Sequence, residues 1–420
     1  MDHFNYRNGQ LYAEDVSVAE IAESVGTPFY VYSTATLVRH FQLFDDALKG
    51  MDHCICYAMK AASNQAILKT LGNLGAGMDV VSGGEYRRAI SAGIPPEKVV
   101  FSGVGKTLEE ITLALQNGIR QFNVESDSEL EQISAIASSM NKIAPIAIRI
   151  NPDVDAQTHE KIATGKAENK FGIPISRARD VYSKASQMPG ISVVGIDLHI
   201  GSQLTDLEPF KKAYQKLADL TQVLRQDGHK IKRLDLGGGL GIPYEKNKSA
   251  PPLPVEYGKM VREVLGHLDC EIEIEPGRLI VGNAGILVSS VLGVKNGGNR
   301  NFLILDAAMN DLIRPAMYDA YHDIIPVKQT NSPEAVYDVV GPVCETGDTF
   351  AKQRIMPELS ESDLVAFRSA GAYGAVMSSE YNTRPLIPEV MVNKNEFSTI
   401  RKRPSYEEII DRDIIPDWLE

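Results

Sequence analysis

Short apolar runs alternate with longer amphipathic stretches between about residue 54 and residue 280. Eight of these runs have the length and composition of buried β-strands, and each intervening stretch is long enough for a helix. The predicted strands are 54–61, 77–82, 99–102, 121–125, 146–151, 193–200, 232–236 and 271–275. Eight β–α repeats predict a closed parallel barrel, and an open doubly wound sheet is the alternative.

Polar side chains stand at nearly every predicted strand end. These ends carry Lys60, Asp79 with Ser82, Ser102, Glu125, Arg149 with Asn151, His199, a glycine run from Gly237, and Glu275 with Arg278. In a barrel enzyme, catalytic groups collect at the carboxyl ends of the strands. One or two of these residues could be helix caps. A purely structural barrel would leave the rest unexplained, so the pattern favours a barrel with an active site.

The pattern changes after about residue 281, where short β-rich runs separated by turn residues appear. These runs are 285–294, 301–306, 335–340, 364–369 and 389–392. The first 27 residues contain a hairpin signal, Tyr6-Arg-Asn-Gly-Gln-Leu-Tyr12. We therefore predict an α/β chain, with a (β/α)8 TIM barrel over residues 28–280 and a mainly antiparallel β domain over residues 281–420. Residues 1–27 would add strands to the β domain.

The composition is that of an ordinary globular protein. The 420 residues are 43% hydrophobic and 23% charged, and the net charge is −12. An acidic chain gives no electrostatic reason to expect nucleic acid or an anionic membrane as partner. The four cysteines form no Cys-x-x-Cys pair, and the N-terminus has no apolar signal-type run, so a cytoplasmic protein is expected. No stretch approaches the roughly 20 apolar residues of a membrane span.

Three patterns resemble other binding motifs but lack an essential residue. Gly103-Val-Gly-Lys-Thr107 has Val100 where a nucleotide P-loop needs its first glycine. Gly237-Gly-Gly-Leu-Gly241 is followed by Ile242 where a dinucleotide fingerprint needs a glycine. His159-Glu160 has no second histidine at metal-ligand spacing, so no metal site is expected.

Lys60 is the most informative residue. It follows the apolar run His53-Cys-Ile-Cys-Tyr-Ala-Met59, where a lone ammonium is costly to desolvate. A Schiff base with a carbonyl cofactor would neutralise that charge. A lysine at a strand end is more often simply solvated, so the interpretation depends on the motifs that accompany it.

Four further motifs fit one ligand. Leu236-Gly-Gly-Gly-Leu-Gly241 would let a phosphate approach exposed backbone N–H groups. His199-Ile-Gly-Ser-Gln203 offers a ring for stacking and a hydroxyl at Ser202, and Glu275-Pro-Gly-Arg278 offers a carboxylate and a guanidinium. Gly341–Asp348 contains Cys344 beside carboxylates. Each alone could be a tight turn, a core histidine, a salt bridge or an inert thiol. Together with Lys60 they favour a phosphorylated pyridine aldehyde.

With these motifs in order, the chain resembles the fold-type III, alanine-racemase-like decarboxylases that use pyridoxal phosphate. Within that family it is most similar to the diaminopimelate decarboxylase group. The matching stretches are 57–61, 77–85, 101–106, 122–126, 149–152, 164–165, 170–172, 199–203, 237–241, 275–278, 314–322, 344–348 and 370–374. Two positions depart from the family pattern. Ala62 stands where asparagine is usual, and Thr346 replaces a serine but keeps the hydroxyl.

The resemblance implies a role for each matching residue. Lys60 would carry pyridoxal 5′-phosphate, and Cys344 of the partner subunit would donate a proton. The cofactor-binding residues would be Lys60, His199, Ser202, Gly237, Gly238, Gly239, Glu275, Gly277, Arg278 and Tyr373. The substrate-binding residues would be Arg278, Arg314, Tyr318, Glu345 and Tyr373.

The resemblance also implies decarboxylation of meso-2,6-diaminopimelate to L-lysine and CO2, the last step of lysine biosynthesis, by a homodimer with active sites at the subunit interface. Arg278, Arg314 and Glu345 suit the second amino acid group of that substrate. A decarboxylase of ornithine, arginine, carboxynorspermidine or a D-amino acid remains an alternative, as do a racemase and a non-catalytic cofactor-binding homologue. A non-catalytic homologue should have lost Lys60 or Cys344, and this chain keeps both.

Overall fold

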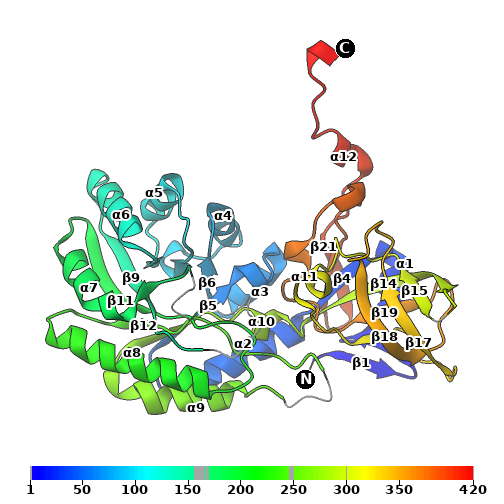
Figure 1. Ribbon diagram of the computed structural model, residues 1–420, viewed down its shortest axis with the longest axis horizontal. Helices are drawn as coiled ribbons and strands as arrows, with labels where there is room; N and C mark the ends of the chain where they lie inside the picture. The colour runs from blue at the N-terminus through cyan, green and yellow to red at the C-terminus, as the bar shows by residue number, and fades with distance from the viewer. Residues whose placement is uncertain (1, 156–164, 166–169, 246–249, 299, 420) are drawn as a thin grey trace. The chain divides into compact units, whose positions relative to one another are not determined.

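The computed structural model describes residues 2–155, 165, 170–245, 250–298 and 300–419. The described residues form two compact units. The barrel unit comprises Leu37–Pro243 and Lys248–Ile280, and the β unit comprises Met1–Thr36, Tyr244–Asn247 and Val281–Glu420. Figure 1 shows that helices surround the strands of the barrel unit, whereas strands dominate the β unit.

The barrel unit is a closed ring of parallel strands. In ring order they are β5 (His53–Ala58), β6 (Gly77–Val80), β7 (Val99–Phe101), β8 (Gln121–Val124), β9 (Ala144–Asn151), β11 (Ile191–Asp197), β12 (Arg233–Asp235) and β13 (Glu271–Ile274), while β10 (Ile173–Pro174) pairs with β9 outside the ring. The ring closes because β13 pairs with β5 and β8 pairs with β9. Each predicted run overlaps one of these strands. The predicted barrel is therefore confirmed, and the open sheet is excluded.

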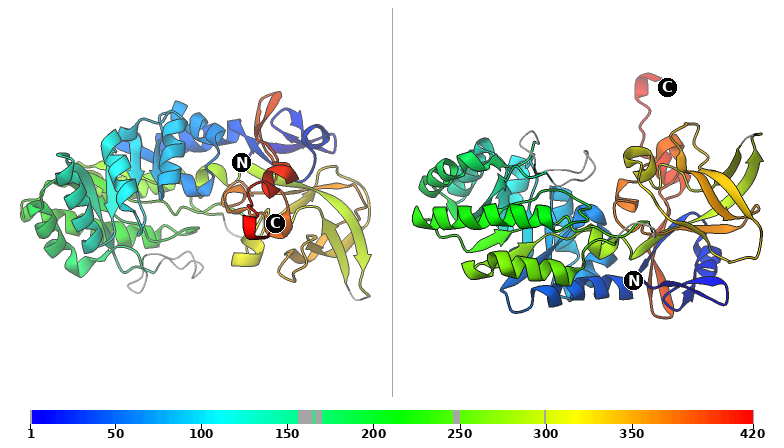
Figure 2. Two further views of the ribbon diagram at one scale, coloured as in Figure 1. Left: turned by 90° about the horizontal axis from the view of Figure 1, so that it is seen from above. Right: turned by 60° about the horizontal axis from the view of Figure 1, so that its bottom comes forward.

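Helices lie before, between and after these strands and surround the barrel (Figure 2). They are α2 (Thr34–Leu48), α3 (Gln65–Asn73), α4 (Gly83–Ser91), α5 (Leu108–Asn117), α6 (Asp127–Ser139), α7 (Ala178–Gln187), α8 (Glu208–Gln226), α9 (Pro254–Leu265) and α10 (Arg278–Val281). Ser82, Thr107 and Ser126 cap α4, α5 and α6 by accepting a backbone N–H three residues later. These hydroxyls satisfy amides that would otherwise have no partner at the helix start.

The β unit is built on a mixed sheet with mainly antiparallel pairings. Its strands in order are β18 (Thr349–Pro357), β17 (Glu334–Val340), β15 (Asn301–Leu305), β14 (Gly285–Asn296), β4 (Phe29–Ser33), β20 (Glu389–Asn393) and β21 (Glu396–Arg401), with β19 (Leu364–Phe367) and β16 (Ile324–Pro326) off this path. Strand β4 falls within the range 28–280 predicted for the barrel domain, yet it pairs with β14 and β20. All five of its residues are buried, as expected for a central strand packed on both faces.

The N-terminal segment belongs to the β unit. Strands β1 (Phe4–Arg7) and β2 (Gln10–Ala13) form a hairpin, and Asn8 and Gly9 adopt the positive φ angles that its turn requires. Strand β3 (Val16–Ser17) and helix α1 (Val18–Val25) follow. One core joins this segment to the mixed sheet through residues that include Phe4, Leu11, Ile21, Val31, Ile286 and Val390. The unit also carries α11 (Arg314–Tyr318) and α12 (Tyr406–Ile410).

None of the helices described is both long enough and apolar enough to cross a membrane.

Candidate active site

Lys60 lies at the carboxyl end of the barrel, on a single 3₁₀ turn, Met59–Ala61, that follows β5. Its Nζ is 3.3 Å from Oδ2 of Asp79, which lies near the end of the neighbouring strand β6. The Asp79 side chain is buried, whereas that of Lys60 is 40% exposed. The Tyr57 hydroxyl donates to the carbonyl of Ala62. The hydrogen bond to its backbone carbonyl therefore anchors Ala62, the residue that stands where the family usually has asparagine.

Glu275 lies directly after β13, in a buried network of polar side chains. Its Oε1 accepts hydrogen bonds from Ser102 Oγ at 3.2 Å and from Asn123 Nδ2 at 3.3 Å. The same Asn123 amide donates to Oδ2 of Asp235 at 2.9 Å. Asn123 thus bridges two buried carboxylates on neighbouring sides of the barrel interior.

The barrel interior holds more carboxylates than its cations balance. Burial raises the pKa of Glu275 well above its usual value, and nearby carboxylates, led by that of Asp235, raise it further. The pKa of Asp197 is also raised, first by burial and then by Asp235. Among the buried polar atoms described, Oδ1 of Asp79 and Oδ1 of Asp197 have no hydrogen-bond partner. Such a site would be stabilised by an additional cation.

His199 follows β11 and is held by the glycine run. Its Nδ1 accepts a hydrogen bond from the N–H of Gly238 at 3.2 Å. Burial lowers the pKa of the imidazole well below its usual value, and the charges of Arg149 and Lys60 lower it further. His199 is therefore a neutral ring in a fixed orientation.

The glycine run packs closely against its neighbours and offers few free hydrogen-bond donors. The N–H of Gly237 donates to Oδ1 of Asp235 at 3.0 Å, and that of Gly238 donates to His199. An added Cβ at Gly237 would collide with the His199 ring, and one at Gly238 would collide with the Glu275 carbonyl. Gly239 has a φ of +120°, which side-chain-bearing residues rarely adopt. Two of the three amides expected to bind a phosphate are thus already engaged within the chain.

Ser202 and Arg278 meet beside this run, because Arg278 Nη2 donates to Ser202 Oγ at 3.1 Å. Arg278 begins α10 and is buried. Gly277 lies before it, and a Cβ there would press on Ala58 and Ala61, which flank the Lys60 turn. These three residues, with Lys60, His199, Glu275 and the glycine run, all lie in the barrel unit.

Arg314 lies in the β unit, at the start of α11, and is buried. Its Nη1 is 2.8 Å from His322 Nε2, and His322 Nδ1 is 2.9 Å from the Arg368 carbonyl. Since Nδ1 must donate to that carbonyl, Nε2 accepts from the guanidinium. The guanidinium also lies 4.7 Å from the centre of the Tyr244 ring. These contacts hold the arginine in one orientation.

Cys344 and Glu345 are exposed on a tight loop of the β unit. The loop is closed by Asp348, whose carboxylate accepts the N–H groups of Val343 and Met309. Oε2 of Glu345 accepts a hydrogen bond from the Tyr381 hydroxyl at 3.1 Å. The loop thus presents a thiol and a carboxylate on a backbone that internal hydrogen bonds fix.

Two other predicted residues belong to the β unit. Tyr318 ends α11 and is half-buried. Tyr373 is half-buried and has a φ of +56°, which is unusual for a residue with a side chain. His159, Glu160 and Thr164 lie outside the described residues.

Sequence reasoning missed the residues beneath the site. Asn123, Asp197 and Asp235 lie on barrel strands and are buried. Glu125 and Arg149 were both expected at strand ends, but their pairing at 2.8 Å was not, nor was the hydrogen bond that Glu125 accepts from the N–H of Gly172. The available signal was the alternation of polar residues within strands that are otherwise apolar, which places their side chains inside the barrel.

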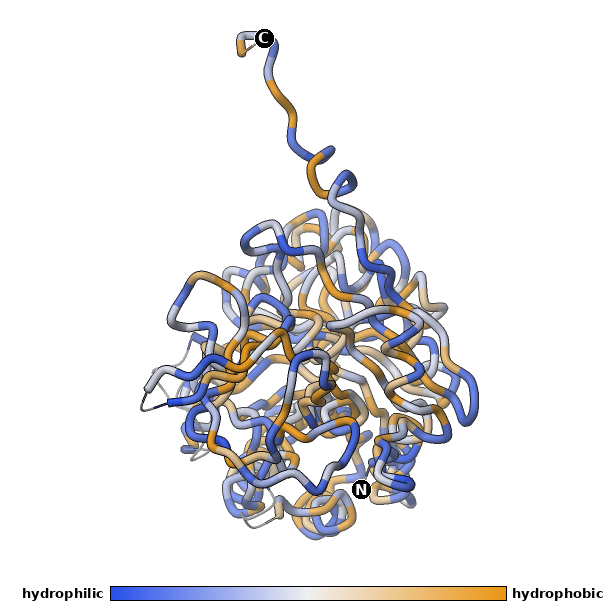
Figure 3. Tube along the Cα trace, turned by 90° about the vertical axis from the view of Figure 1, so that its right-hand side faces the viewer, coloured by the Kyte–Doolittle hydropathy of each residue, from blue (hydrophilic) through white to orange (hydrophobic). Residues whose placement is uncertain are grey.

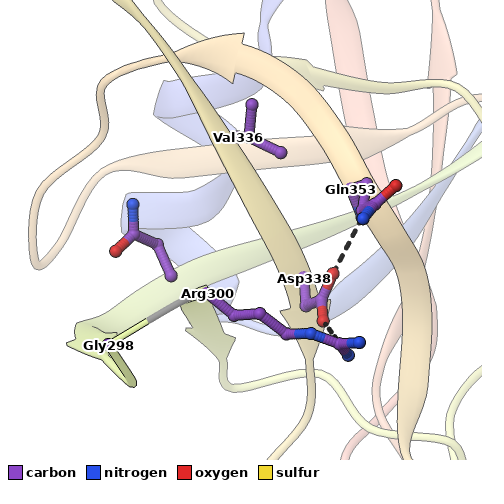
Figure 4. Close-up of a pocket in the computed structure, with 6 residues that line it drawn as sticks. Gly298, Arg300, Val336, Asp338 and Gln353 are labelled. Carbon is purple, nitrogen blue, oxygen red and sulfur yellow. Dashed lines mark hydrogen bonds and ion pairs between the residues drawn. The ribbon is translucent and has the colours of Figure 1, made fainter.

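A hollow of about 180 Å³ lies elsewhere in the β unit (Figure 4). It is lined by Gly298, Arg300, Asn301, Val336, Asp338 and Gln353, and Arg300 pairs with Asp338 at 3.1 Å. None of the predicted site residues lines it. It is also smaller than the roughly 300 Å³ at which small-molecule sites begin.

A family model described as the pyridoxal binding domain of pyridoxal-dependent decarboxylases matches residues 34–282, which is more than half of the chain. The chain belongs to this family. The diaminopimelate decarboxylase of Vibrio cholerae is 52% identical over 405 residues, which cover 96% of each chain. That of Haemophilus influenzae is 50% identical over 411 residues, which cover 97% of this chain and 98% of the relative.

Solved structures of this family have the same fold. A diaminopimelate decarboxylase from Helicobacter pylori, complexed with L-lysine, is 42% identical and superimposes with a TM-score of 0.90 over 94% of this chain and 98% of that one. The resemblance to the diaminopimelate decarboxylase group is therefore confirmed.

The barrel residues fit the cofactor that this family implies. The excess of buried carboxylates around Glu275 suits the protonated nitrogen of a pyridine ring. Glycines at 237 and 238 let the backbone approach His199 and the Glu275 carbonyl more closely than any larger residue would allow. Lys60 offers a primary amine at the same end of the barrel. An amine, a cation-binding carboxylate and a neutral ring are the groups that pyridoxal phosphate requires.

Proposed function

We propose that this chain is a pyridoxal-phosphate-dependent carboxy-lyase that converts meso-2,6-diaminopimelate into L-lysine and CO2, as the last step of lysine biosynthesis. The arrangement of Lys60, His199 and Glu275 at one end of the barrel carries this proposal. The names of its relatives and the L-lysine complex of a homologue support the choice of substrate.

Lys60 would hold the cofactor through its amine, and Asp79 orients that amine. His199 would present its neutral face to the ring, and Glu275 would pair with the ring nitrogen. Ser202 and Arg278 would bind near the phosphate together with Gly237, Gly238, Gly239 and Gly277. Tyr373 would be a further phosphate ligand. Bound pyridoxal phosphate supplies the electron sink that makes loss of CO2 possible.

The Asn123 bridge restrains Glu275 and Asp235, so the carboxylate keeps its position as charge develops above it. Such preorganised groups need no rearrangement during the reaction. A Glu275 that is ionised opposite a protonated ring nitrogen would keep that nitrogen cationic.

Recognition of the substrate would depend on its second amino acid group. Arg278 and Arg314 are buried guanidiniums that could pair with carboxylates, while Glu345 offers an acceptor for an amine. Tyr318 and Tyr373 would complete this binding set. Ornithine, lysine and arginine lack the distal carboxylate and would leave a buried guanidinium without its anion.

Cys344 would return a proton to the substrate carbon after CO2 leaves. The family resemblance places Cys344 of the partner subunit in this role, and its exposure in a single chain agrees with such sharing. We therefore propose a homodimer with shared active sites. The four cysteines are free thiols, which supports a reducing cytoplasm as its location.

The test is CO2 release from meso-2,6-diaminopimelate by the purified chain with added pyridoxal phosphate. Ornithine, arginine and D-lysine are assayed in parallel. We expect release from meso-2,6-diaminopimelate alone, with L-lysine as the product. Release from another substrate instead would keep the cofactor assignment and reject the roles of Arg278, Arg314 and Glu345.

A further inference from the structure

The last nine described residues include large apolar side chains that are open to solvent. Ile414 is 88% exposed, Ile415 71%, Trp418 85% and Leu419 70%. They lie on the segment that follows α12, here called the C-terminal arm and defined as residues 411–419 (Figures 1 and 3). A run of apolar side chains this exposed is typical of a segment that binds another surface.

The root of the C-terminal arm is fixed to the β unit. Arg412 Nη2 lies 2.6 Å from Oε2 of Glu380, and Ile409 is buried. Ser405 and Glu408 form a capping box that starts α12. The arm therefore leaves the β unit from a defined point.

The segment that binds the root of the arm, Glu380–Tyr381, also contacts the Cys344 loop. Glu380, which anchors Arg412, is followed by Tyr381, whose hydroxyl donates to Glu345. Cys344 and Glu345 are exposed, and the proposed function places this loop at the boundary between two subunits. The root of the arm is thus continuous with that proposed interface.

We propose that the C-terminal arm docks on a second copy of this chain, beside the interface through which Cys344 is shared. This proposal rests on the homodimer of the proposed function. Two copies related by a twofold axis would exchange arms reciprocally, so the contact closes on itself and buries both apolar segments. Trp418 is the natural anchor, because tryptophan is enriched among the residues that dominate binding energy at interfaces.

Trp418 also reports the state of the arm, because it is the only tryptophan in the chain. In concentrated holoenzyme we expect blue-shifted tryptophan emission that acrylamide quenches poorly. On dilution, the emission should shift to the red in step with dimer dissociation measured by analytical ultracentrifugation. Emission of an exposed indole at every concentration would overturn the proposal. So would a shielded indole in a monomer, which would place the arm on its own chain.

Variants test the same contact without fluorescence. A chain that ends after Arg412 and the Trp418→Ala chain should each raise the dimer dissociation constant at least tenfold. Tyr406→Ala is the matched control, because Tyr406 is an exposed aromatic residue of α12 outside the arm. Dissociation constants equal to that of the unmodified chain in both arm variants would overturn the proposal.

The two proposals fail in different ways. An unmodified chain that decarboxylates meso-2,6-diaminopimelate, but whose dimer is unaffected by loss of the arm, keeps the proposed function and rejects the docking arm. A chain that dimerises through the arm but releases no CO2 rejects the proposed function alone. A chain that is monomeric at all concentrations rejects the arm contact, and the decarboxylation assay then decides the function separately.

Discussion

Single residues set the electrostatics of the barrel interior. Asp79, Asp197, Asp235 and Glu275 are buried, and the first three lie close enough to raise the pKa of Glu275. Lys60 and Arg149 provide the nearby positive charge. Because burial penalises ionised carboxyls, this arrangement favours a bound cation over an empty site.

Lys60→Ala should remove the covalent attachment of the cofactor. We expect loss of the visible absorbance of the lysine–pyridoxal Schiff base and a fall in turnover on the order of 10³-fold or more. Absorbance spectra and CO2 release measure the two effects. Lys69→Ala, on the exposed side of α3, is the control and should leave both unchanged. Normal absorbance in the Lys60 variant would disprove the attachment.

Asn123→Ala should destabilise the barrel from within. The change deprives Asp235 and Glu275 of a shared donor, and an unsatisfied buried acceptor costs about 1–3 kcal/mol. Chemical denaturation of the cofactor-free chain measures this loss, and cofactor titration measures the accompanying loss of affinity. Asn117→Ala, on the surface of α5, removes a similar amide from an exposed site. Equal stability of the two variants would show that the bridge contributes nothing.

Among the elements, the loop after β12 is under tight steric constraints. Gly238 has ordinary backbone angles, but a Cβ at this position would strike the Glu275 carbonyl. Gly238→Ala should therefore displace the end of β13 and weaken binding of pyridoxal phosphate at least tenfold. Gly105→Ala is the matched control, because a Cβ there meets nothing within 4 Å. Equilibrium titration with the cofactor distinguishes them, and equal affinities would refute the steric argument.

Strand β13 contributes a pH-sensitive element on its inward face. Burial, followed by the charge of Asp235, raises the pKa of Glu273 to about 8 from the ordinary 4.5. Between these values the folded chain retains a proton that the unfolded chain has lost. The stability that this carboxyl contributes is complete below pH 4.5 and is lost as the pH rises towards 8.

Glu273→Gln should cancel this loss, because glutamine stays neutral. Relative to the unmodified chain, the variant should gain stability between pH 5 and pH 8, at no more than about 1.4 kcal/mol per pH unit. Urea unfolding of the cofactor-free chains across this range measures the difference. Glu97→Gln, at an exposed position, should show no such trend. Parallel pH profiles for Glu273→Gln and the unmodified chain would contradict the assignment.

For the whole molecule, the proposed catalytic residues divide between the two units. Lys60 lies in the barrel unit and Cys344 in the β unit. Lys60→Ala should abolish cofactor attachment, whereas Cys344→Ala should keep the cofactor and slow turnover. If each site combines the lysine of one chain with the cysteine of another, a mixed dimer of these variants contains one intact site.

Co-refolding the two impaired variants tests this sharing. Random assembly should restore about a quarter of the unmodified activity, because half of the dimers are mixed and each has one intact site. Lys60→Ala refolded with a Lys60→Ala, Cys344→Ala double variant should restore none. Absence of recovery in the first mixture would place both residues in the same chain.

Much of the fold followed from local pattern. Short apolar runs and the amphipathic stretches between them located all eight barrel strands, because strand burial imposes that pattern directly on the sequence. The spacing of Lys60, His199, Glu275 and Cys344 within their motifs indicated the chemistry for the same reason, since each motif is a short contiguous segment. The tight turn at Asn8-Gly9 was likewise encoded locally.

Tertiary structure decided what depends on contacts between distant residues. Phe29–Ser33 joined the mixed sheet because strands far away in the sequence cover both of its edges. Asn123 bridges Asp235 and Glu275 because closure of the barrel brings these residues, which are far apart in the sequence, into contact. The amides of Gly237 and Gly238 are engaged by Asp235 and His199. The sequence by itself thus determined the elements and the reactive groups. Closure of the ring, which sets distances between side chains on different strands, determined their protonation, orientation and partners.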